Sequence, residues 1–200
     1  MNHARTLHPL PNTHERLRQT ALELFSTHGY QSTSLRDLAT RLGVQAGSIY
    51  NHIENKQSLL FELMEEALDD LLAETRLSLK LEGSTQARLR QFVQTFVGFQ
   101  SRERQRLALL DRETLNLSQE QRERIAVLRN EYAQCLGAVI TSEPMAVKLP
   151  NSTMQVLTHG IIGMLQSLPL WNDGDSALPS QEVVDQLTAM IAGAITAAKR

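Results

Sequence analysis

The sequence predicts an all-α fold, and three observations support this. Apolar residues recur at intervals of three and four along almost the whole chain, as they do on the buried face of a helix. No segment shows the apolar–polar alternation that is typical of a strand, and none reads as a tight hairpin turn. Hydrophobic residues make up 42% of the 200 positions, enough for several helices to share a buried core. We expect about nine helices.

The first 55 residues predict a short arm followed by three helices. Residues 1–11 contain two prolines and no periodicity, which indicates a flexible arm. Within residues 12–55, a first helix ends at Gly29, a second ends at Gly43, and a very short third runs from about 45 to 52. The inner faces of the first two helices consist of Leu17, Ala21, Leu24, Phe25, Leu35, Leu38, Ala39 and Leu42.

Residues 56–200 predict a second region with six further helices. Each has apolar residues at helical spacing, and breaks rich in Gly, Ser or Pro separate most of them. We expect these helices at about 55–79, 89–97, 102–117, 119–139, 157–168 and 183–195. The last two have wide apolar faces, which predicts that both lie deep in a bundle or at an interface.

The charge distribution favours a nucleic-acid-binding segment joined to another module. A net charge of −2 on its own argues against a nucleic-acid binder. Residues 1–60, however, hold six Lys or Arg against four Asp or Glu, whereas residues 61–200 hold fourteen against eighteen. No stretch has the length of a membrane span or the pattern of a secretory signal, so we expect a cytoplasmic protein. The single cysteine, Cys135, excludes an intramolecular disulfide.

Three helices within about fifty residues, with a glycine turn before a very short third, predict a helix-turn-helix module. The small side chain of Ala39 permits close packing of the second and third helices, and Gly43 permits the turn between them. Polar residues occupy the exposed positions of the third helix and its borders, namely Gln45, Ser48, Tyr50, Asn51, His52 and Lys56. Such groups suit phosphate binding, with a few left to contact base edges.

This segment closely resembles the tetracycline-repressor (TetR) family of bacterial regulators. The matching residues stand in one register: Ala21–Phe25, Gly29–Tyr30, Thr33–Ala39, Gly43–Val44, Gly47–Tyr50, His52, Lys56 and Leu59–Leu60. The resemblance implies a homodimeric DNA-binding transcriptional regulator, most simply a repressor that leaves a palindromic operator when a small-molecule inducer binds. Double-stranded operator DNA, a second copy of the chain and the inducer are therefore the expected partners.

The resemblance also assigns roles to single residues. It implies mostly phosphate contacts for Thr33, Tyr50, His52 and Lys56, and sequence preference for Arg36, Gln45, Ala46, Ser48 and Asn51; with Ser34, these are the candidate DNA-binding residues. The chain departs from the family at Gln45 and Ala46, where a serine and then a lysine are common, so we expect a weaker N-cap for the third helix. Ile53 replaces the usual phenylalanine, which we expect the core to tolerate.

Two later stretches resemble the branch of TetR regulators that responds to acyl-coenzyme A thioesters. They are 115–129 with Glu131–Tyr132, and 170–174 with 178–182. The candidate ligand-binding residues are Phe92, Phe96, Phe99, Leu110, Arg129 and Tyr132, the apolar ones lining a tunnel and the arginine meeting phosphates. The alternative is that the aromatic residues are ordinary core and that the arginines belong to a salt-bridged surface. We expect no metal and no cofactor beyond this effector.

The last two predicted helices are the candidate dimer interface. Their apolar faces carry small residues, including Gly160, Gly163 and Ala194, which permit close helix contact. The resemblance implies a four-helix interface with two helices from each subunit. The interface candidates are Leu157, Ile161, Met164, Leu168, Val184, Leu187, Ile191 and Ile195. A role in the core of one subunit is the alternative.

Two other classes of protein compete with a regulator. An enzyme would need a nucleophile elbow, a phosphate-binding loop, a dinucleotide fingerprint or a metal-binding histidine pair, and the sequence contains none of these patterns. A helical adaptor that binds only protein would explain the bundle but not the polar register from Thr33 to Lys56. The sequence assigns no operator, no regulated gene and no role to Cys135, His159 or Trp171, and it leaves repressor against activator open.

Overall fold

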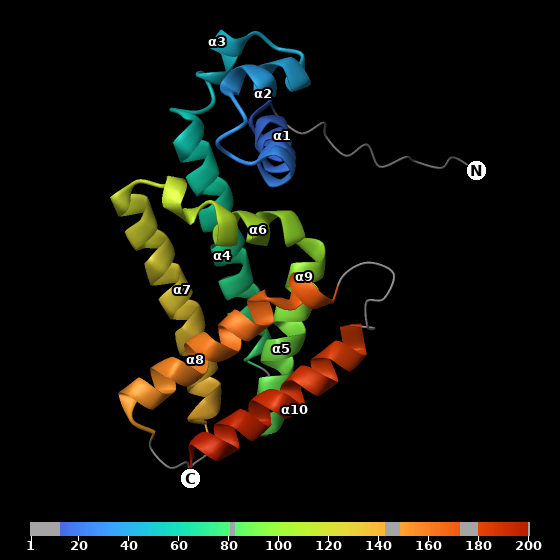
Figure 1. Cartoon of the computed structure of the whole chain (residues 1–200), viewed down its shortest axis with the longest axis vertical. Helices are drawn as coiled ribbons and strands as arrows, with labels where there is room; N and C mark the ends of the chain where they lie inside the picture. The colour runs from blue at the N-terminus through green and yellow to red at the C-terminus, as the bar shows by residue number, and fades with distance from the viewer. Residues whose placement is uncertain (1–12, 81–82, 143–148, 173–179, 200) are drawn as a thin grey trace, which may run out of the picture. The chain divides into compact units, whose positions relative to one another are not determined.

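The computed structural model describes residues 13–80, 83–142, 149–172 and 180–199. In these ranges the chain is helical, which confirms the predicted class, with ten α-helices and one 3-10 helix. They are α1 (Thr13–His28), α2 (Leu35–Leu42), α3 (Ala46–Ile49), α4 (Lys56–Ser78), α5 (Thr85–Arg102), α6 (Arg104–Arg112), η1 (Thr114–Asn116), α7 (Gln119–Ile140), α8 (Asn151–Gln166), α9 (Leu168–Trp171) and α10 (Ser180–Ala198) (Figure 1). The predicted arm at 1–11 lies outside the described residues. None of the described helices is long and apolar enough to cross a membrane.

The chain folds into two compact units. Unit 1 consists of residues 1–64 and 105–121, and unit 2 of residues 65–104 and 122–200. Helix α4 therefore begins in unit 1 and ends in unit 2. The segment 105–121 belongs to unit 1 together with the N-terminal helices.

Unit 1 is built on α1 and α2. Helix α1 buries Leu17, Ala21 and Phe25, and the ring of Phe25 meets the Tyr30 ring edge-on at 5.3 Å between centroids. Helix α2 begins with a capping box, in which Ser34 and Asp37 each accept a backbone N–H of the other.

Gly43 ends α2 with φ 71°, and its N–H donates to the carbonyl oxygens of the last turn. This left-handed conformation is the one for which glycine was expected at the turn.

Unit 2 has a core of long apolar side chains between helices. Helices α5 and α10 pack against each other, and α8 contacts both (Figure 1). Helix α5 buries Phe92, Phe96 and Phe99, while α10 contributes Val184 and Ile191. Burial of this kind stabilises the fold by roughly 1.5–3 kcal/mol for each large side chain.

The helix expected over 102–117 is interrupted in the structure. Helix α5 ends at Arg102, α6 runs from Arg104 to Arg112, and η1 follows after Glu113. The carboxylate of Glu113 accepts the backbone N–H of Tyr30, 83 positions earlier in the chain. This long-range bond lies in the turn between α6 and η1, and residue spacing alone does not reveal it.

Candidate nucleic-acid interface

Helix α3 is a single turn whose position depends on packing. Its residue Ile49 is fully buried. Ile53, which stands where the family usually has phenylalanine, is buried as well and so still fills the core. Gln45 occupies the N-cap position and makes no side-chain cap hydrogen bond, as expected for the weaker cap. A helix this short has little stability of its own, so tertiary contacts hold it in place.

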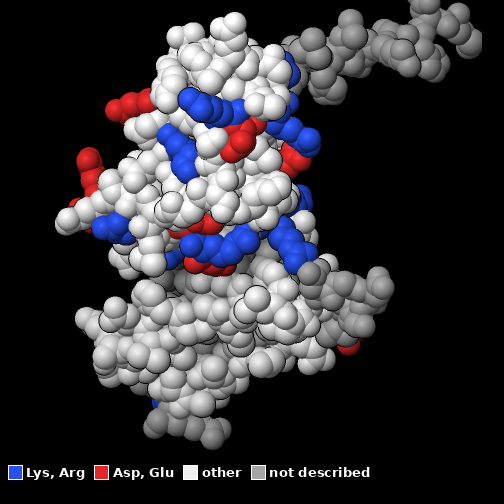
Figure 2. Space-filling view, turned by 45° about the horizontal axis from the view of Figure 1, so that its top comes forward, with Lys and Arg blue, Asp and Glu red and all other residues white. Residues whose placement is uncertain are grey.

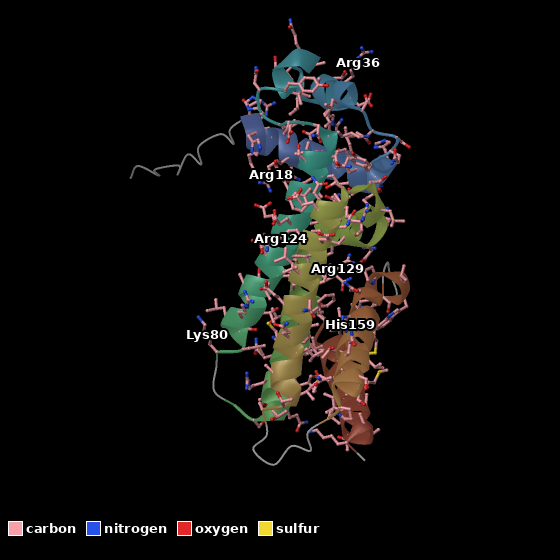
Figure 3. The ribbon with its side chains drawn as sticks, turned by 90° about the vertical axis from the view of Figure 1, so that its left-hand side faces the viewer. Arg18, Arg36, Lys80, Arg124, Arg129 and His159 are labelled. Atoms are coloured by element: carbon pink, nitrogen blue, oxygen red, sulfur yellow. The ribbon has the colours of Figure 1, made fainter. Side chains whose placement is uncertain are left out.

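Seven of the ten candidate DNA-binding residues are exposed around α3 and the start of α2. They are Ser34, Arg36, Gln45, Ser48, Tyr50, Asn51 and His52, and Ala46 is half-buried. The Tyr50 side chain is 61% exposed although tyrosine is large and partly apolar. Arg36 points away from the helices of unit 1 (Figure 3). These residues present hydroxyl, amide, imidazole and guanidinium groups on one short stretch of the chain.

The two remaining candidates are directed into the protein. The Thr33 hydroxyl is buried and donates to the carbonyl oxygen of Gly29 at 2.9 Å. The Lys56 ammonium donates to the carbonyl oxygens of Tyr30 at 2.9 Å and Thr33 at 2.8 Å, and lies 4.0 Å from the centre of the Tyr30 ring. Their expected phosphate contacts remain predictions, and in this structure both side chains bind the backbone of unit 1.

Charges near the candidate interface are mixed. On the face shown in Figure 2, Lys and Arg alternate with Asp and Glu and do not form a continuous basic stripe. Arg41 bonds to Glu23 at 2.8 Å, and the hydrogen bonds from Ser34 lower the pKa of the Asp37 carboxyl. Neutral hydrogen-bonding groups therefore make up most of this surface, with Arg36 as its exposed guanidinium.

The candidate effector residues of unit 2 form an aromatic cluster. Phe92 and Phe96 lie 5.1 Å and 6.5 Å from Tyr132 between ring centroids, and all three are buried. Phe99 is also buried, with Arg102 over its ring at 5.9 Å. Leu110 is buried in unit 1, so the structure does not group it with the others.

Arginines near this cluster are partly engaged by glutamates. Arg102 bonds to Glu74 at 2.7 Å and Arg124 to Glu65 at 2.7 Å, as the salt-bridged alternative predicted. Arg129 leaves α7 on another side from Arg124 and is half-buried (Figure 3). Arg129 is therefore less exposed than Arg102 and Arg124.

Sequence reasoning missed two buried polar groups in unit 2, Thr75 and Gln100, whereas Tyr132 was among its effector candidates. The Gln100 amide oxygen is shielded from solvent and makes no hydrogen bond within the described residues. The Thr75 and Tyr132 hydroxyls are shielded as well, and within the described residues they have no hydrogen-bond partner except each other. The hydrogen bond with Thr75 opposes the rise in the pKa of Tyr132, but burial dominates and raises that pKa. An unsatisfied buried polar atom costs roughly 1–3 kcal/mol. A signal was present, because Thr75 interrupts the apolar stripe of α4 at Leu71 and Leu72.

Six of the eight interface candidates are buried in the described part of this single subunit. Ile161, Leu168, Val184, Leu187, Ile191 and Ile195 are buried within the described chain, while Leu157 and Met164 are half-buried. The other face of α8 and α10 is open: Val156 is 74% exposed and Met190 60%. A Cβ placed on Gly160, Gly163 or Gly193 would meet nothing within 4 Å. A partner helix on this face would contact the glycines together with Val156 and Met190.

Two family descriptions match the chain. Residues 82–195 match the model described as "Tetracyclin repressor-like, C-terminal domain", and residues 17–63 match "Bacterial regulatory proteins, tetR family". The chain belongs to the TetR family. It is therefore a DNA-binding transcriptional regulator and not an enzyme, and members of this family typically act on operator DNA as homodimers.

Curated sequence relatives match only part of this TetR-family chain. The repressor KstR2 of Rhodococcus jostii is 38% identical over 56 residues, 28% of each chain. The nucleoid occlusion factor SlmA of Escherichia coli is 36% identical over 88 residues, 44% of each chain. The match thus spans less than half the length of these curated relatives.

Solved structures share the fold along nearly the whole chain. A TetR-family regulator from Rhodococcus RHA1 superposes with a TM-score of 0.84 at 20% identity, covering 92% of this chain and 97% of that one. KstR2 of Mycobacterium tuberculosis gives 0.77 at 20% identity, covering 94% and 97%. AibR, solved in complex with isovaleryl coenzyme A and operator DNA, gives 0.77 at 20% identity, covering 88% and 96%.

Proposed function

We propose that this TetR-family protein is a homodimeric repressor that binds a palindromic operator and leaves it when an acyl-coenzyme A thioester binds. The observation that carries the DNA-binding part is the set of exposed polar side chains around α3, with Tyr50 61% exposed. Packing does not require these groups there. They match the mixture of phosphate and base-edge contacts that a helix-turn-helix makes. As a regulator of chromosomal DNA, the protein acts in the cytoplasm.

A dimer follows from the size of α3 and from the open face of α8 and α10. One four-residue helix buries too little surface for operator affinity, so two copies bind half-sites one turn of DNA apart, about 34 Å. Gly160, Gly163 and Gly193 have open space where a side chain would lie, and exposed Val156 and Met190 add apolar area. The partner helices therefore pack against small residues, as in a four-helix interface.

The effector proposal draws on the core of unit 2 and on one structural relative. Phe92, Phe96 and Tyr132 supply apolar contact for an acyl chain. The buried hydroxyls of Thr75 and Tyr132, which have no hydrogen-bond partner except each other in the described residues, supply partners for a polar group such as the thioester carbonyl. AibR, a relative by fold, was solved with isovaleryl coenzyme A. A drug-like or aromatic apolar effector is the second candidate, because the same aromatic cluster suits it.

Two measurements test the proposal. Selection of bound sequences from random DNA, followed by footprinting, is expected to return a palindrome whose affinity falls steeply with salt. Acyl-coenzyme A esters of increasing chain length, the matching free acids and coenzyme A alone are then titrated into the protein–operator complex. Release by thioesters only supports the effector assignment. Release by none of them removes it and leaves the repressor assignment standing, whereas failure to select any DNA removes both.

A further inference from the structure

The segment 105–121 joins α5 to α7, yet it packs as part of unit 1. Its corner at Glu113 reaches the loop between α1 and α2. The Glu113 side chain is buried, with the residue 8% exposed; Oε1 accepts the Tyr30 N–H at 3.3 Å and Oε2 accepts the Asn116 amide at 2.7 Å. Arg112 donates to the Ser26 carbonyl oxygen at 3.0 Å. This corner thus holds the end of α1 and the residues directly after it.

Asn116 extends the same set of contacts to α4. Its backbone carbonyl accepts the Gln57 amide at 2.8 Å, and its side-chain oxygen accepts the Gln31 amide. Gln57 lies in the first turn of α4, and Gln31 lies in the loop before α2. The segment 105–121 therefore contacts the two parts of the chain that flank α2 and α3.

Lys56 contacts the same loop between α1 and α2. Its ammonium donates to the carbonyl oxygens of Tyr30 and Thr33 and lies over the Tyr30 ring. Burial lowers the pKa of Lys56, and the negative charge of Glu113 opposes that change. An ammonium has three protons to donate. Two are used on backbone carbonyls and the charge also faces an aromatic ring, so a phosphate contact would compete with these interactions.

We propose that Glu113 and Lys56 are positioning residues for DNA recognition. Together they fix residues 30–33, which lead into α2, and thereby set the orientation of α2 and α3 as a pair. Operator specificity then depends on the carboxylate of Glu113, which contacts no DNA and lies more than 60 positions after α3 in the chain. This inference rests on the proposed operator binding. It assigns to Lys56 a role different from the phosphate contact that the family resemblance implies.

The physical reason is the cost of leaving backbone groups of the loop without partners. Glu113 accepts the Tyr30 N–H, and Lys56 donates to the carbonyl oxygens of Tyr30 and Thr33. Removing either side chain leaves shielded backbone groups unsatisfied, so the loop loosens to admit water. Contacts with phosphates tolerate a small displacement of α2 and α3, so a loosened loop still allows them. Contacts with base edges depend on a precise register, so a loosened loop weakens them.

The test is a double-mutant cycle on the full chain with Glu113→Gln and Lys56→Met. Glu120→Gln is the matched control, since it removes the same charge from an exposed position of the same segment. Affinities for the selected operator and for mixed-sequence DNA are measured by fluorescence anisotropy over a range of salt. We expect each variant to lower the ratio of operator to mixed-sequence affinity about 10-fold with an unchanged salt slope. The double variant is expected to lose little more, because the residues act together.

The opposite result is equally clear. If Lys56 contacts phosphate, Lys56→Met weakens binding to all sequences alike and reduces the salt slope by about one. Such a result, with Glu113→Gln matching Glu120→Gln, overturns the proposal.

Hydrogen exchange of the DNA-free protein separates this inference from operator binding itself. The amides of residues 30–38 are expected to exchange about 10-fold faster in Glu113→Gln than in Glu120→Gln. Asn116→Ala, which keeps both charges, is expected to give a smaller increase and serves if Glu113→Gln does not fold. Equal exchange in Asn116→Ala and Glu120→Gln overturns the positioning role. If the wild-type protein binds no DNA, the proposed function fails, while exchange still reports whether the loop is held.

Discussion

The Lys56 ammonium lies 4.0 Å from the centre of the Tyr30 ring and donates to the carbonyl oxygen of the same residue at 2.9 Å. Tyr30 directly follows Gly29, where α1 has ended, and Lys56 is the first residue of α4. The pair therefore ties together the two ends of the segment that contains α2 and α3. In this structure the Lys56 side chain, for which the family resemblance implies a phosphate contact, supports the loop that leads into α2.

Exposed residues at the end of α3 provide the first test of DNA binding. Tyr50→Phe combined with His52→Ala removes a hydroxyl and an imidazole that no described core contact uses, so stability is expected to stay within about 0.5 kcal/mol. Affinity is expected to fall by a similar factor for operator and mixed-sequence DNA, because phosphate contacts carry no sequence information. Anisotropy titration checks this, with Gln86→Ala on α5 as the control. Unchanged affinity for both DNAs contradicts the assignment.

Sequence preference is expected to respond to different residues. Gln45→Ala and Asn51→Ala each remove an exposed amide capable of pairing with a base edge. Each is expected to relax preference at one position of each half-site, with a loss of about 1–3 kcal/mol for the preferred base. Repeating the selection from random DNA with each variant reveals the change. If both variants select the same sequence as the wild type, these two side chains contact no base edge.

The open face of α8 and α10 predicts a dimer that a single bulky charge disrupts. Gly163→Arg places its Cβ in open space within the subunit, so the monomer is expected to keep its helical content. The guanidinium would be buried without a partner in a close helix contact, and dimerisation is expected to fail. Sedimentation velocity and operator binding check this, with Gln86→Arg as a control for added charge. A stable dimer of Gly163→Arg would place the interface elsewhere.

The buried hydroxyl of Thr75 predicts a substitution that tests the proposed effector site. Thr75→Val keeps the shape of the side chain and removes the hydroxyl whose hydrogen bond opposes the rise in the pKa of Tyr132. The free energy of unfolding, measured by urea denaturation, is expected to change by no more than about 1 kcal/mol, because one weak hydrogen bond is lost. Effector release of DNA is expected to weaken, because the proposed site loses one of its polar groups. Unchanged release by every effector would remove Thr75 from that site.

The capping box of α2 predicts a specific dependence of stability on pH. Hydrogen bonds from Ser34 lower the pKa of Asp37 in the folded chain below its value in the unfolded chain. The stabilisation is therefore fully present above the unfolded pKa, near 4, and is lost as the pH falls through the lower folded value. Asp37→Asn is expected to be less stable than the wild type at pH 7, with the difference shrinking below pH 4. Urea midpoints across pH 2–7 measure it, and a difference independent of pH would exclude this carboxylate as its source.

Local features of the chain were predictable from the sequence. Helical periodicity, the left-handed turn at Gly43 and the weak cap at Gln45 depend on residues within one or two turns, and the structure agrees with each. The exposed polar residues of α3 follow from the same local pattern, because the apolar positions beside them must face inward. The recognition segment was therefore the part of the candidate site that sequence reasoning described best.

Tertiary structure decided the points that depend on contacts between distant residues. Wide apolar faces on α8 and α10 leave two buried faces possible, and only packing against α5 places Ile161 and Ile191 inside and Gly163 outside. The inward direction of Lys56 and the break at Glu113 likewise require the Tyr30 loop, which lies 26 and 83 positions away. Residue spacing specifies which side of a helix is apolar. Which partner covers that side, and which groups a half-buried cation such as Lys56 contacts, depends on packing between segments that are distant in the sequence.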